Sequence, residues 1–260
     1  MKTIAVANQK GGVGKTTTSV NLAASLAAMQ RSVLLIDLDP QGNATMSSGV
    51  DKHAVELTAY DLLIEGTPLK QVATPAAENG FHVVPANRDL TAAEVELLQL
   101  EGRERRLANA IAATNSPDGG YDFVVIDCPP SLSMLTVNAL VAADSVLITM
   151  QCEYFALEGL SALLNTIQRI ADTVNPSLEI EGILRTMYDP RNSLTGEVSE
   201  QLHKHFGDLV YRTVIPRNVR LAEAPSHGLP ALYYDRYSAG ARAYAALAGE
   251  FIKRQTAVGD

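Results

Sequence analysis

The chain has 260 residues and a formal net charge of −8, with 47% hydrophobic and 19% charged residues. This balance is ordinary for a globular protein and excludes a chain that is disordered throughout. Two cysteines, Cys128 and Cys152, are too few for a disulfide scaffold or a four-cysteine zinc site. No apolar run approaches the roughly 20 residues of a membrane-spanning helix, and the apolar N-terminal stretch is too short for a signal peptide. We therefore expect a soluble, cytoplasmic protein.

The acidic net charge argues against a protein that coats nucleic acid, but the charge is unevenly distributed. Residues 185–254 contain ten basic and seven acidic residues, whereas residues 1–184 contain eleven basic and 21 acidic ones. Attraction to a polyanion depends on the local positive potential rather than on the total charge. Any contact with a polyanion is therefore expected in the C-terminal third of the chain.

Short apolar segments alternate with helix-length segments along the whole chain. In chain order the pattern predicts a strand at 3–7, helix 15–29, strand 33–37, helix 54–65, strand 81–85, helix 90–113, strand 123–127, helix 132–142, strand 146–150, helix 157–174, strand 180–186, helix 193–206, strand 210–216 and helix 239–254. Several strands are continuous in Val, Ile and Leu, which is typical of strands covered on both faces.

This alternation predicts right-handed crossovers and an α/β fold, with a mainly parallel twisted sheet and helices on both faces. The chain contains no internal repeat and no linker rich enough to divide it. We expect one domain over residues 1–255 and a short tail at 256–260, with a turn at 116–120.

The segment between the first predicted strand and the first predicted helix has the composition of a phosphate-binding loop. It reads Gln9-Lys-Gly-Gly-Val-Gly-Lys-Thr-Thr17. Glycines let backbone N–H groups turn inward around a phosphate, and the helix N-terminus adds positive potential. In such a loop Lys15 reaches the β- and γ-phosphates and the hydroxyl of Thr16 ligates Mg²⁺.

The loop departs from the usual G-x-x-x-x-G-K-[ST] pattern in two ways. Gln9 stands where the first glycine belongs, and a second lysine, Lys10, precedes the glycine pair. A glycine-rich turn with incidental lysines is the alternative interpretation. The order strand, glycines, Lys-Thr and helix favours the phosphate loop.

Carboxylates follow two other predicted strands. Asp127 ends the strand at 123–127, and Asp37 and Asp39 lie at the end of the strand at 33–37 and directly after it. Ligands bind at the carboxyl ends of strands in open α/β sheets, so Asp127 could hold Mg²⁺ there. Alternation in an extended segment places Asp37 and Asp39 on one face, beside the loop. Each aspartate alone is more often a cap or turn residue, but together with the loop they predict a nucleotide site.

These motifs resemble those of the ParA/MinD group of P-loop ATPases. The loop from Lys10 looks like the deviant Walker A motif of the group, the segment 37–45 is similar to the second motif of its ParA/Soj branch, and 127–131 resembles the Walker B motif of that branch. Further matches lie at 151–159, 186–191 and 215–228, so the resemblance extends from residue 2 to about residue 254. The chain is identified by this resemblance as a ParA/Soj-type partitioning ATPase with a P-loop NTPase fold.

The resemblance implies ATP and Mg²⁺ as cofactors, and slow hydrolysis of ATP to ADP and phosphate. Lys10, Lys15 and Asp39 would be the catalytic residues, with Asp39 orienting the attacking water, and Asp37, Asp127 and Thr16 would support Mg²⁺. The nucleotide-binding residues would be Lys10, Gly11, Gly12, Val13, Gly14, Lys15, Thr16 and Thr17 in the loop, with Pro216 and Asn218 at the adenine.

The resemblance also implies partners. Two ATP-bound copies would form a sandwich dimer in which Lys10 reaches the phosphates of the other subunit. The dimer would bind double-stranded DNA without sequence preference, and Arg191 and Arg220 match positions used for DNA. A ParB/Spo0J-type centromere-binding protein would stimulate hydrolysis and release. The protein would be nucleoid-associated when ATP-bound, with no membrane partner.

Three alternatives fit parts of the pattern less well. A MinD-like membrane ATPase needs an amphipathic C-terminal helix, and the residues from Phe251 onward have too few apolar positions. A nitrogenase-reductase-like carrier needs cluster cysteines, which Cys128 does not match. A scaffold that binds ATP and DNA without hydrolysis is separated from an ATPase only by a turnover assay. Both cysteines, and the aromatic pair Tyr154 and Phe155, are expected to be buried.

Overall fold

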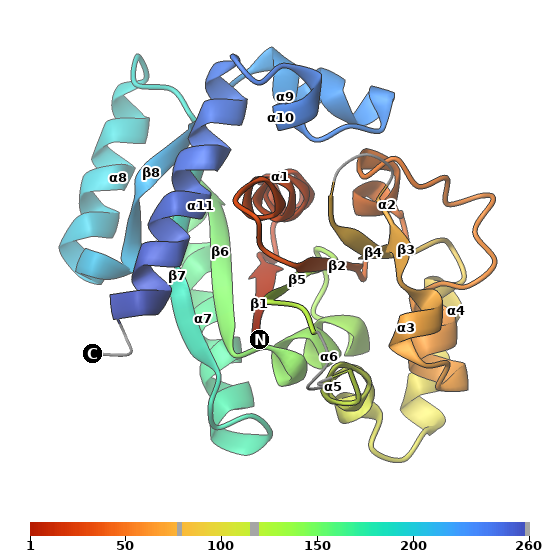
Figure 1. The fold of residues 1–260 in the computed structure, drawn as a ribbon. Helices are drawn as coiled ribbons and strands as arrows, with labels where there is room; N and C mark the ends of the chain where they lie inside the picture. Colours follow the sequence, from red (N-terminus) through yellow and green to blue (C-terminus); the bar gives the residue numbers. More distant parts are fainter. Residues whose placement is uncertain (77–79, 115–119, 258–260) are drawn as a thin grey trace.

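An eight-stranded sheet forms the centre of the computed structural model, which describes residues 1–76, 80–114 and 120–257 (Figure 1). The strand order is β3-β4-β2-β5-β1-β6-β7-β8, and every neighbouring pair is parallel except the antiparallel pair β3 and β4. The strands are β1 (Lys2–Ala7), β2 (Val33–Asp37), β3 (Thr74–Pro75), β4 (His82–Val84), β5 (Phe123–Asp127), β6 (Ser145–Gln151), β7 (Glu179–Tyr188) and β8 (Val210–Pro216). The predicted α/β fold with a mainly parallel sheet is confirmed.

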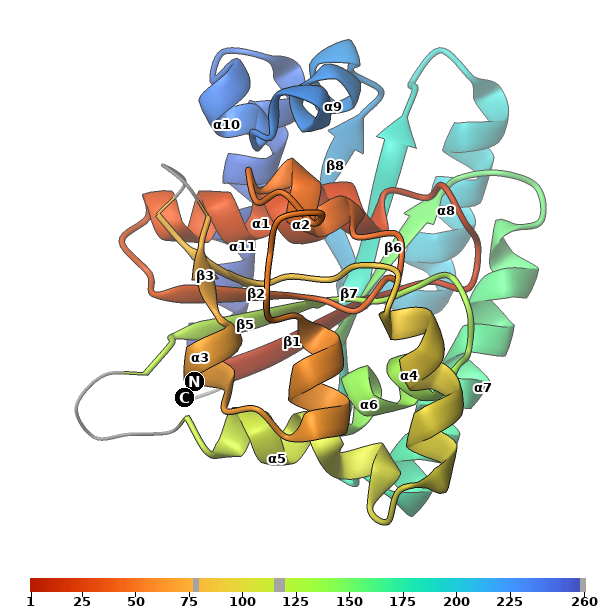
Figure 2. The ribbon, with the colours of Figure 1, turned by 90° about the vertical axis from the view of Figure 1, so that its right-hand side faces the viewer.

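Helices cover both faces of the sheet, as predicted (Figure 2). One face carries α1 (Lys15–Ala28), α2 (Asn43–Ser47), α9 (Val219–Glu223), α10 (Ala231–Tyr234) and α11 (Ala239–Ala257). The other carries α3 (Leu69–Val72), α4 (Leu90–Glu96), α5 (Arg106–Ala112), α6 (Met134–Ala142), α7 (Ala156–Thr173) and α8 (Ser193–Phe206). None of the helices in the described ranges is long and apolar enough to cross a bilayer.

The apolar run of β2 shows how the sequence builds this double core. All five residues of β2 are buried. Because side chains alternate along a strand, Leu34 and Ile36 pack into the core on the α6 side, whereas Val33 and Leu35 pack into the core on the α1 side. A continuous apolar strand is therefore the pattern of a sheet that is covered on both faces.

Two predicted helices are shorter than their periodicity suggests. Only the end of the helix predicted at 54–65 is helical, from residue 59 onward, with Asp61–Glu65 of π type. The loop before it ends at Thr58, whose backbone N–H donates to the carboxylate of Asp61 at 2.8 Å. The helix predicted at 90–113 is interrupted at Gly102, whose φ of +61° reverses the chain between α4 and α5.

Several short elements carry too few residues for a periodic signal and were not predicted. They are α2, α3, α9, α10, β3 and the 3₁₀ turns at Gly207–Leu209 and Ala224–His227, whereas the 3₁₀ turns at Leu97–Gln99 and Arg103–Arg105 lie within the helix predicted at 90–113. At the C-terminus α11 continues to Ala257 and so includes the first two residues of the tail predicted at 256–260, and 258–260 lie outside the described residues. The turn predicted at 116–120 also lies mostly outside them.

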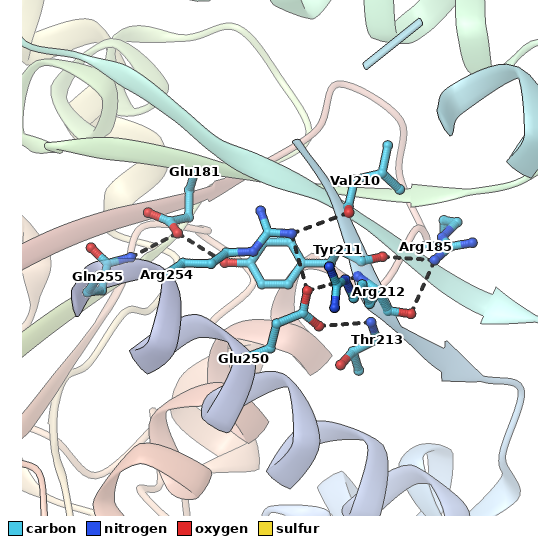
Figure 3. A network of polar contacts seen from close by, with 9 residues as sticks. All are labelled: Glu181, Arg185, Val210, Tyr211, Arg212, Thr213, Glu250, Arg254 and Gln255. Carbon is cyan, nitrogen blue, oxygen red and sulfur yellow. Dashed lines mark hydrogen bonds and ion pairs between the residues drawn. The ribbon is translucent and has the colours of Figure 1, made fainter. Parts of the chain in front are cut away.

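A polar network fastens α11 to the edge of the sheet (Figure 3). Glu250 accepts the backbone N–H groups of Arg212 and Thr213, both at 2.9 Å. Glu181 accepts Tyr211 Oη at 3.0 Å and Gln255 Nε2 at 2.9 Å. The network binds the end of the chain to β7 and β8 through hydrogen bonds that are mostly half-buried.

Glu181 reaches this network because β7 contains a bulge. Val146 of β6 pairs with Ile180 and Leu147 pairs with Gly182, which leaves Glu181 as the extra residue. Gly182 has a φ of +153°. A Cβ atom on this glycine would lie 2.6 Å from Tyr211 Cε2 and 2.7 Å from the Leu209 carbonyl oxygen. The position has space only for glycine.

Replacing Gly182 by alanine is expected to destabilise the protein by about 1–3 kcal/mol, because the new methyl group overpacks against Tyr211 and a backbone carbonyl. Gly196→Ala is the matched control: no atom lies within 4 Å of its Cβ position, and alanine in a helix is neutral to stabilising by up to about 1 kcal/mol. Urea unfolding of both variants measures the difference. Equal stability of the two variants would contradict the close approach at Gly182.

Candidate nucleotide-binding site

The loop between β1 and α1 lies at the carboxyl ends of the central strands. Strand β1 is flanked by β5 and β6, so the loop stands between the segments that follow these two strands. Gly12 has a φ of +75°, and Gly14, the N-cap of α1, has a φ of +83°. Glycine adopts these left-handed conformations without steric cost. The glycines therefore shape the predicted loop.

Backbone donors in this loop are open to an anion. From Gly11 to Thr17, no backbone N–H group donates to an acceptor within the described residues. A Cβ atom at Gly11 or Gly12 would meet nothing within 4 Å, so the loop faces open space. Free N–H groups at the start of a helix, reinforced by the helix dipole, favour a phosphate group. The loop fits the polyphosphate that the sequence predicts.

Lys15 brings a buried positive charge to the loop. Its side chain is 6% exposed, and its Nζ donates to the backbone carbonyl of Lys10 at 3.2 Å. Burial lowers the pKa of Lys15, while the nearby carboxylates of Asp127 and Asp39 oppose this shift. A buried ammonium group with a carbonyl as its hydrogen-bond acceptor is ready to exchange that acceptor for an anionic oxygen.

Asp127 is fully buried at the end of β5 and holds the start of α1. Its two oxygens accept the hydroxyls of Thr16 and Ser19, each at 2.8 Å. Sequence reasoning missed Ser19, which lies four residues after Lys15 on the same side of the helix; its helical spacing from Thr16 was the available signal. Thr16 and Asp127 thus meet as predicted, with oxygens of the kind that Mg²⁺ prefers.

Asp37 lies beside Asp127, but its oxygens are committed to its own loop. The two aspartates are paired in the register of β2 and β5. Asp37 Oδ2 accepts the backbone N–H and the hydroxyl of Thr45, both at 2.8 Å, and Oδ1 accepts Asp39 N–H at 3.1 Å. Asp37 therefore positions α2 and the Asp39 segment directly, and its role in supporting Mg²⁺ stays a prediction.

Asp39 is half-buried and keeps a free oxygen. Its Oδ1 accepts the backbone N–H of Gln41 at 2.9 Å, and within the described ranges Oδ2 has no hydrogen-bond partner. Its charge acts on Lys15, Asp37 and Asp127. The prediction that Asp39 lies beside the loop agrees with these interactions.

A metal ion would need ligands beyond the protein at this site. Among the residues that the structure describes, no three His, Cys, Asp or Glu side chains gather as a metal site. Thr16 and Asp127 supply oxygens, and Mg²⁺ commonly completes its shell with substrate phosphates and water. The donor set therefore suits a magnesium ion that arrives with a polyphosphate.

An apolar cavity of about 360 Å³ adjoins the loop. It is lined by Gly14, Thr17, Thr186, Met187, Ile215, Pro216, Arg217, Asn218, Val219, Leu221, Ala222 and Tyr244. The fold thus brings Pro216 and Asn218 beside Gly14 and Thr17, as a base next to a phosphate would require. Sequence reasoning missed Thr186, whose hydroxyl donates to the Val13 carbonyl at 2.8 Å and braces the loop.

A larger cavity, of about 850 Å³, lies at the amino ends of the strands, near Lys2, Glu179 and Lys253. It contains none of the predicted site residues, and size alone does not identify the site. The smaller cavity is favoured because it shares residues with the open N–H groups of the loop.

Lys10 stands apart from the buried lysine. It is exposed, and its Nζ forms an ion pair with Glu153, which follows β6. In a single copy of the chain its ammonium group is therefore directed to the neighbouring strand end. Such a lysine is available for a contact beyond its own loop.

The two predicted DNA-binding arginines lie in separate segments, which follow the carboxyl ends of β7 and β8. Arg191, after β7, donates to both oxygens of Asp189 at 2.9 and 2.8 Å. Arg220, on α9, pairs with Glu223 at 2.7 Å and with Asp235 at 3.4 Å. Exposed ion pairs of this kind contribute little free energy, so a phosphate can replace the carboxylates.

Stability of the nucleotide-free and magnesium-free protein is expected to fall as the pH rises. Burial raises the pKa of Asp127 to about 8 and that of Asp37 to about 6. An aspartate in the unfolded chain has a pKa of about 3.9, so the unfolded state loses its protons first. The free energy of unfolding therefore decreases from about pH 4 to pH 8, by no more than about 1.4 kcal/mol per pH unit and group.

Urea unfolding between pH 4 and pH 8.5 measures this slope. Between pH 6 and 8 it is mainly Asp127 that still titrates in the folded state, because Asp37 has a pKa of about 6. Asp127→Asn should flatten that part of the curve. The same slope in the variant would show that Asp127 is already ionised in the folded protein at pH 6.

Comparisons with known proteins agree with this geometry. A family model described as an AAA domain matches residues 1–180. The chromosome partitioning protein ParA of Caulobacter vibrioides is 50% identical, covering 98% of this chain and 95% of that protein. Sporulation initiation inhibitor protein Soj of Bacillus subtilis is 52% identical, covering 96% of this chain and 97% of that protein.

A solved structure shares the fold with a nucleotide in place. Cobyrinic acid a,c-diamide synthase from Mycobacterium smegmatis, bound to an ATP analogue and magnesium, is 36% identical with a TM-score of 0.85, covering 98% of this chain and 96% of that one. The partitioning relatives match at a higher identity over nearly the same length. The family predicted from the motifs is confirmed: the chain belongs to the ParA/Soj family of chromosome-partitioning P-loop ATPases.

Proposed function

We propose that the protein is a DNA-partitioning ATPase that uses Mg²⁺-ATP to switch between a free chain and a DNA-bound dimer. One observation supports nucleotide binding above all. The open N–H groups from Gly11 to Thr17, the buried Lys15 and the Asp127–Thr16 pair lie together at the carboxyl ends of the central strands. Partitioning names belong to relatives about 50% identical, against 36% for the diamide synthase, so partitioning is the better supported activity.

ATP binding would use the loop and the cavity together. The loop N–H groups and Lys15 hold the phosphates, while the apolar cavity with Pro216 and Asn218 takes the adenine. Thr16 and Asp127 would hold Mg²⁺, with Asp37 supporting the site through α2. When bound, Mg²⁺ neutralises charge on the β- and γ-phosphates. Binding is expected to be strongest above the pKa of Asp127, where its carboxylate is charged.

Asp39 is the residue proposed to orient the attacking water. It is half-buried, its Oδ2 accepts no hydrogen bond from the residues that the structure describes, and its charge acts on Lys15. An aspartate that orients water without a stronger base gives modest acid–base catalysis. We therefore propose slow hydrolysis, accelerated when DNA and a ParB/Spo0J-type protein bind.

Lys10 is proposed to join two ATP-bound copies. The triphosphate concentrates negative charge at the loop, and a lysine from each copy can neutralise the phosphates of the other. ATP then becomes part of the contact, and loss of the γ-phosphate weakens it. The exposure of Lys10 and its exchangeable ion pair with Glu153 support this role.

Lys10→Ala and Lys15→Ala are expected to fail at different steps. Without Lys15 the buried charge at the loop is lost, and ATP binding should weaken at least about 100-fold, as loss of a charged hydrogen-bond partner predicts. Without Lys10 the chain should bind ATP normally but remain monomeric with Mg²⁺-AMPPNP. Fluorescent-nucleotide titration and analytical ultracentrifugation separate the two steps.

Lys253→Ala is the control for removal of a surface lysine, since Lys253 lies at the far cavity. It should bind ATP and dimerise like the unmodified protein. If Lys10→Ala also dimerises normally, Lys10 does not act across the interface.

DNA binding is proposed for the C-terminal third, through Arg191 and Arg220. A dimer presents both arginines twice, so affinity rises when both halves engage one duplex. Phosphate contacts carry no sequence information, which agrees with non-specific binding. The protein would then associate with the nucleoid in its ATP state.

A salt series with long duplex DNA of arbitrary sequence tests this function. Binding should require Mg²⁺-ATP, disappear with ADP, and weaken by roughly 0.9 log units per log unit of salt for each phosphate neutralised. Arg220→Ala should reduce that slope by about 1 for each phosphate that the arginine no longer neutralises, and it should leave dimerisation intact.

Arg31→Ala is the matched control, because Arg31 precedes β2 and so lies at the amino ends of the strands, away from the loop. It should bind DNA with unchanged affinity. DNA binding that is equal with ATP, ADP and no nucleotide would refute the switch.

A further inference from the structure

Two large aromatic side chains stand in solvent at the start of α7. Tyr154 is 74% exposed and Phe155 is 71% exposed, and their rings form an edge-to-face pair with centroids 4.9 Å apart. The expectation that these residues are buried beside a strand end is wrong. The buried positions of α7 begin later, at Leu160, and continue through Leu163 and Ile167. The pair therefore packs mainly on itself.

The aromatic pair borders the phosphate loop. It directly follows Glu153, which forms the ion pair with Lys10, so the pair lies next in the chain to a residue that contacts the loop. Strand β6, which leads to the pair, is a neighbour of β1, which leads to the loop. Lys10 and the aromatic rings thus belong to one continuous surface.

A further apolar side chain stands on the opposite flank of the loop. Leu132 follows β5, the other neighbour of β1, and is 49% exposed. Exposed apolar groups thus lie on both sides of a charged loop. Protein–protein interfaces typically combine an aromatic core with charged contacts, so this surface has the composition of such an interface.

We propose that Tyr154 and Phe155 form an apolar contact through which two ATP-bound copies of this chain associate. The inference rests on the proposed ATP-dependent dimer and names the surface that holds it together. Two copies carry a net charge of −8 each, so they repel at long range, and bound ATP adds negative charge. Lys10 offsets the phosphates, and the aromatic pair adds a short-range attraction that does not depend on charge.

A second copy is the occupant favoured by continuity with Lys10. A two-fold interface uses the same patch on both subunits, so a surface that contains Lys10 also presents its adjoining residues to the partner copy. Aromatic anchors near the centre of an interface carry a large share of its binding energy.

The test compares Tyr154→Ser/Phe155→Ser with Val95→Ser/Leu98→Ser. The control residues are also exposed, at 65% and 49%, but lie on and directly after α4. Dimerisation with Mg²⁺-AMPPNP is measured by analytical ultracentrifugation, with fluorescent-nucleotide binding and thermal unfolding as checks. The aromatic variant should bind nucleotide and unfold like the unmodified protein, but dimerise at least tenfold more weakly. The control should dimerise normally.

A labelling experiment reads the same surface without removing both rings. Cys128 and Cys152 are 1% and 4% exposed, so Phe155→Cys introduces a far more accessible thiol. Its reaction with a maleimide should slow with Mg²⁺-AMPPNP, and the protection should grow with protein concentration. Protection at every concentration would mean a movement within one copy and would overturn the proposal.

Failure of the inference differs from failure of the proposed function. If the unmodified protein stays monomeric with Mg²⁺-AMPPNP, the dimer switch itself is refuted. If it dimerises and the aromatic variant dimerises equally well, only the aromatic contact is refuted. An aromatic variant that dimerises normally but no longer responds to a ParB-type protein would assign the patch to that protein instead.

Discussion

The buried carboxylate of Asp127 is the interaction on which the site depends. It lies at the end of a central strand, where two hydroxyl groups near the N-terminus of α1 donate hydrogen bonds to it. These bonds fix the direction of α1 and therefore the direction in which the free N–H groups of the loop point. Burying a charged carboxylate in this position costs free energy, and burial therefore raises the pKa of Asp127 to about 8. Nucleotide and Mg²⁺ would relieve that cost.

The neighbouring carboxylates divide their tasks by their partners. Asp37 lies opposite Asp127 in the sheet but uses its oxygens to hold Thr45 and Asp39 N–H. Asp39 is half-buried, and its Oδ2 has no hydrogen-bond partner among the described residues. One buried carboxylate thus organises the segment, and the other is left available for chemistry. The two aspartates differ in burial and in partners: Asp37 is fully buried with both oxygens hydrogen-bonded, whereas Asp39 is half-buried and accepts through Oδ1.

Charge at the surface of the site is arranged in exchangeable pairs. Lys10 with Glu153, Arg191 with Asp189 and Arg220 with Glu223 are exposed ion pairs, which water and salt weaken. Each cation can leave its carboxylate for a phosphate at little cost. Under the proposed function, the buried groups would define where the nucleotide sits, and the exposed pairs would suit contacts that form and break with the nucleotide state.

Local sequence was sufficient to predict the phosphate loop, the aspartates at the strand ends and most long helices and strands, because each of these depends on residues close together in the chain. Glycines that accept positive φ, continuous apolar strands and long helical periodicity are signals of this kind. Local sequence did not predict three other features: the cavity shared by Pro216 and Gly14, the bulge at Glu181, and the hydrogen bond from Thr186 to Val13. They depend on strand order and on contacts between distant segments.

The same distinction explains the wrong predictions. Residues 54–65 have a helical pattern, but a hydrogen bond from Thr58 to Asp61 confines the regular turn to the end of that segment. Tyr154 and Phe155 are aromatic and follow a buried strand, yet both stand in solvent. Burial is a property of what packs against a residue, and periodicity within a segment does not contain that information. Packing between segments therefore set these features.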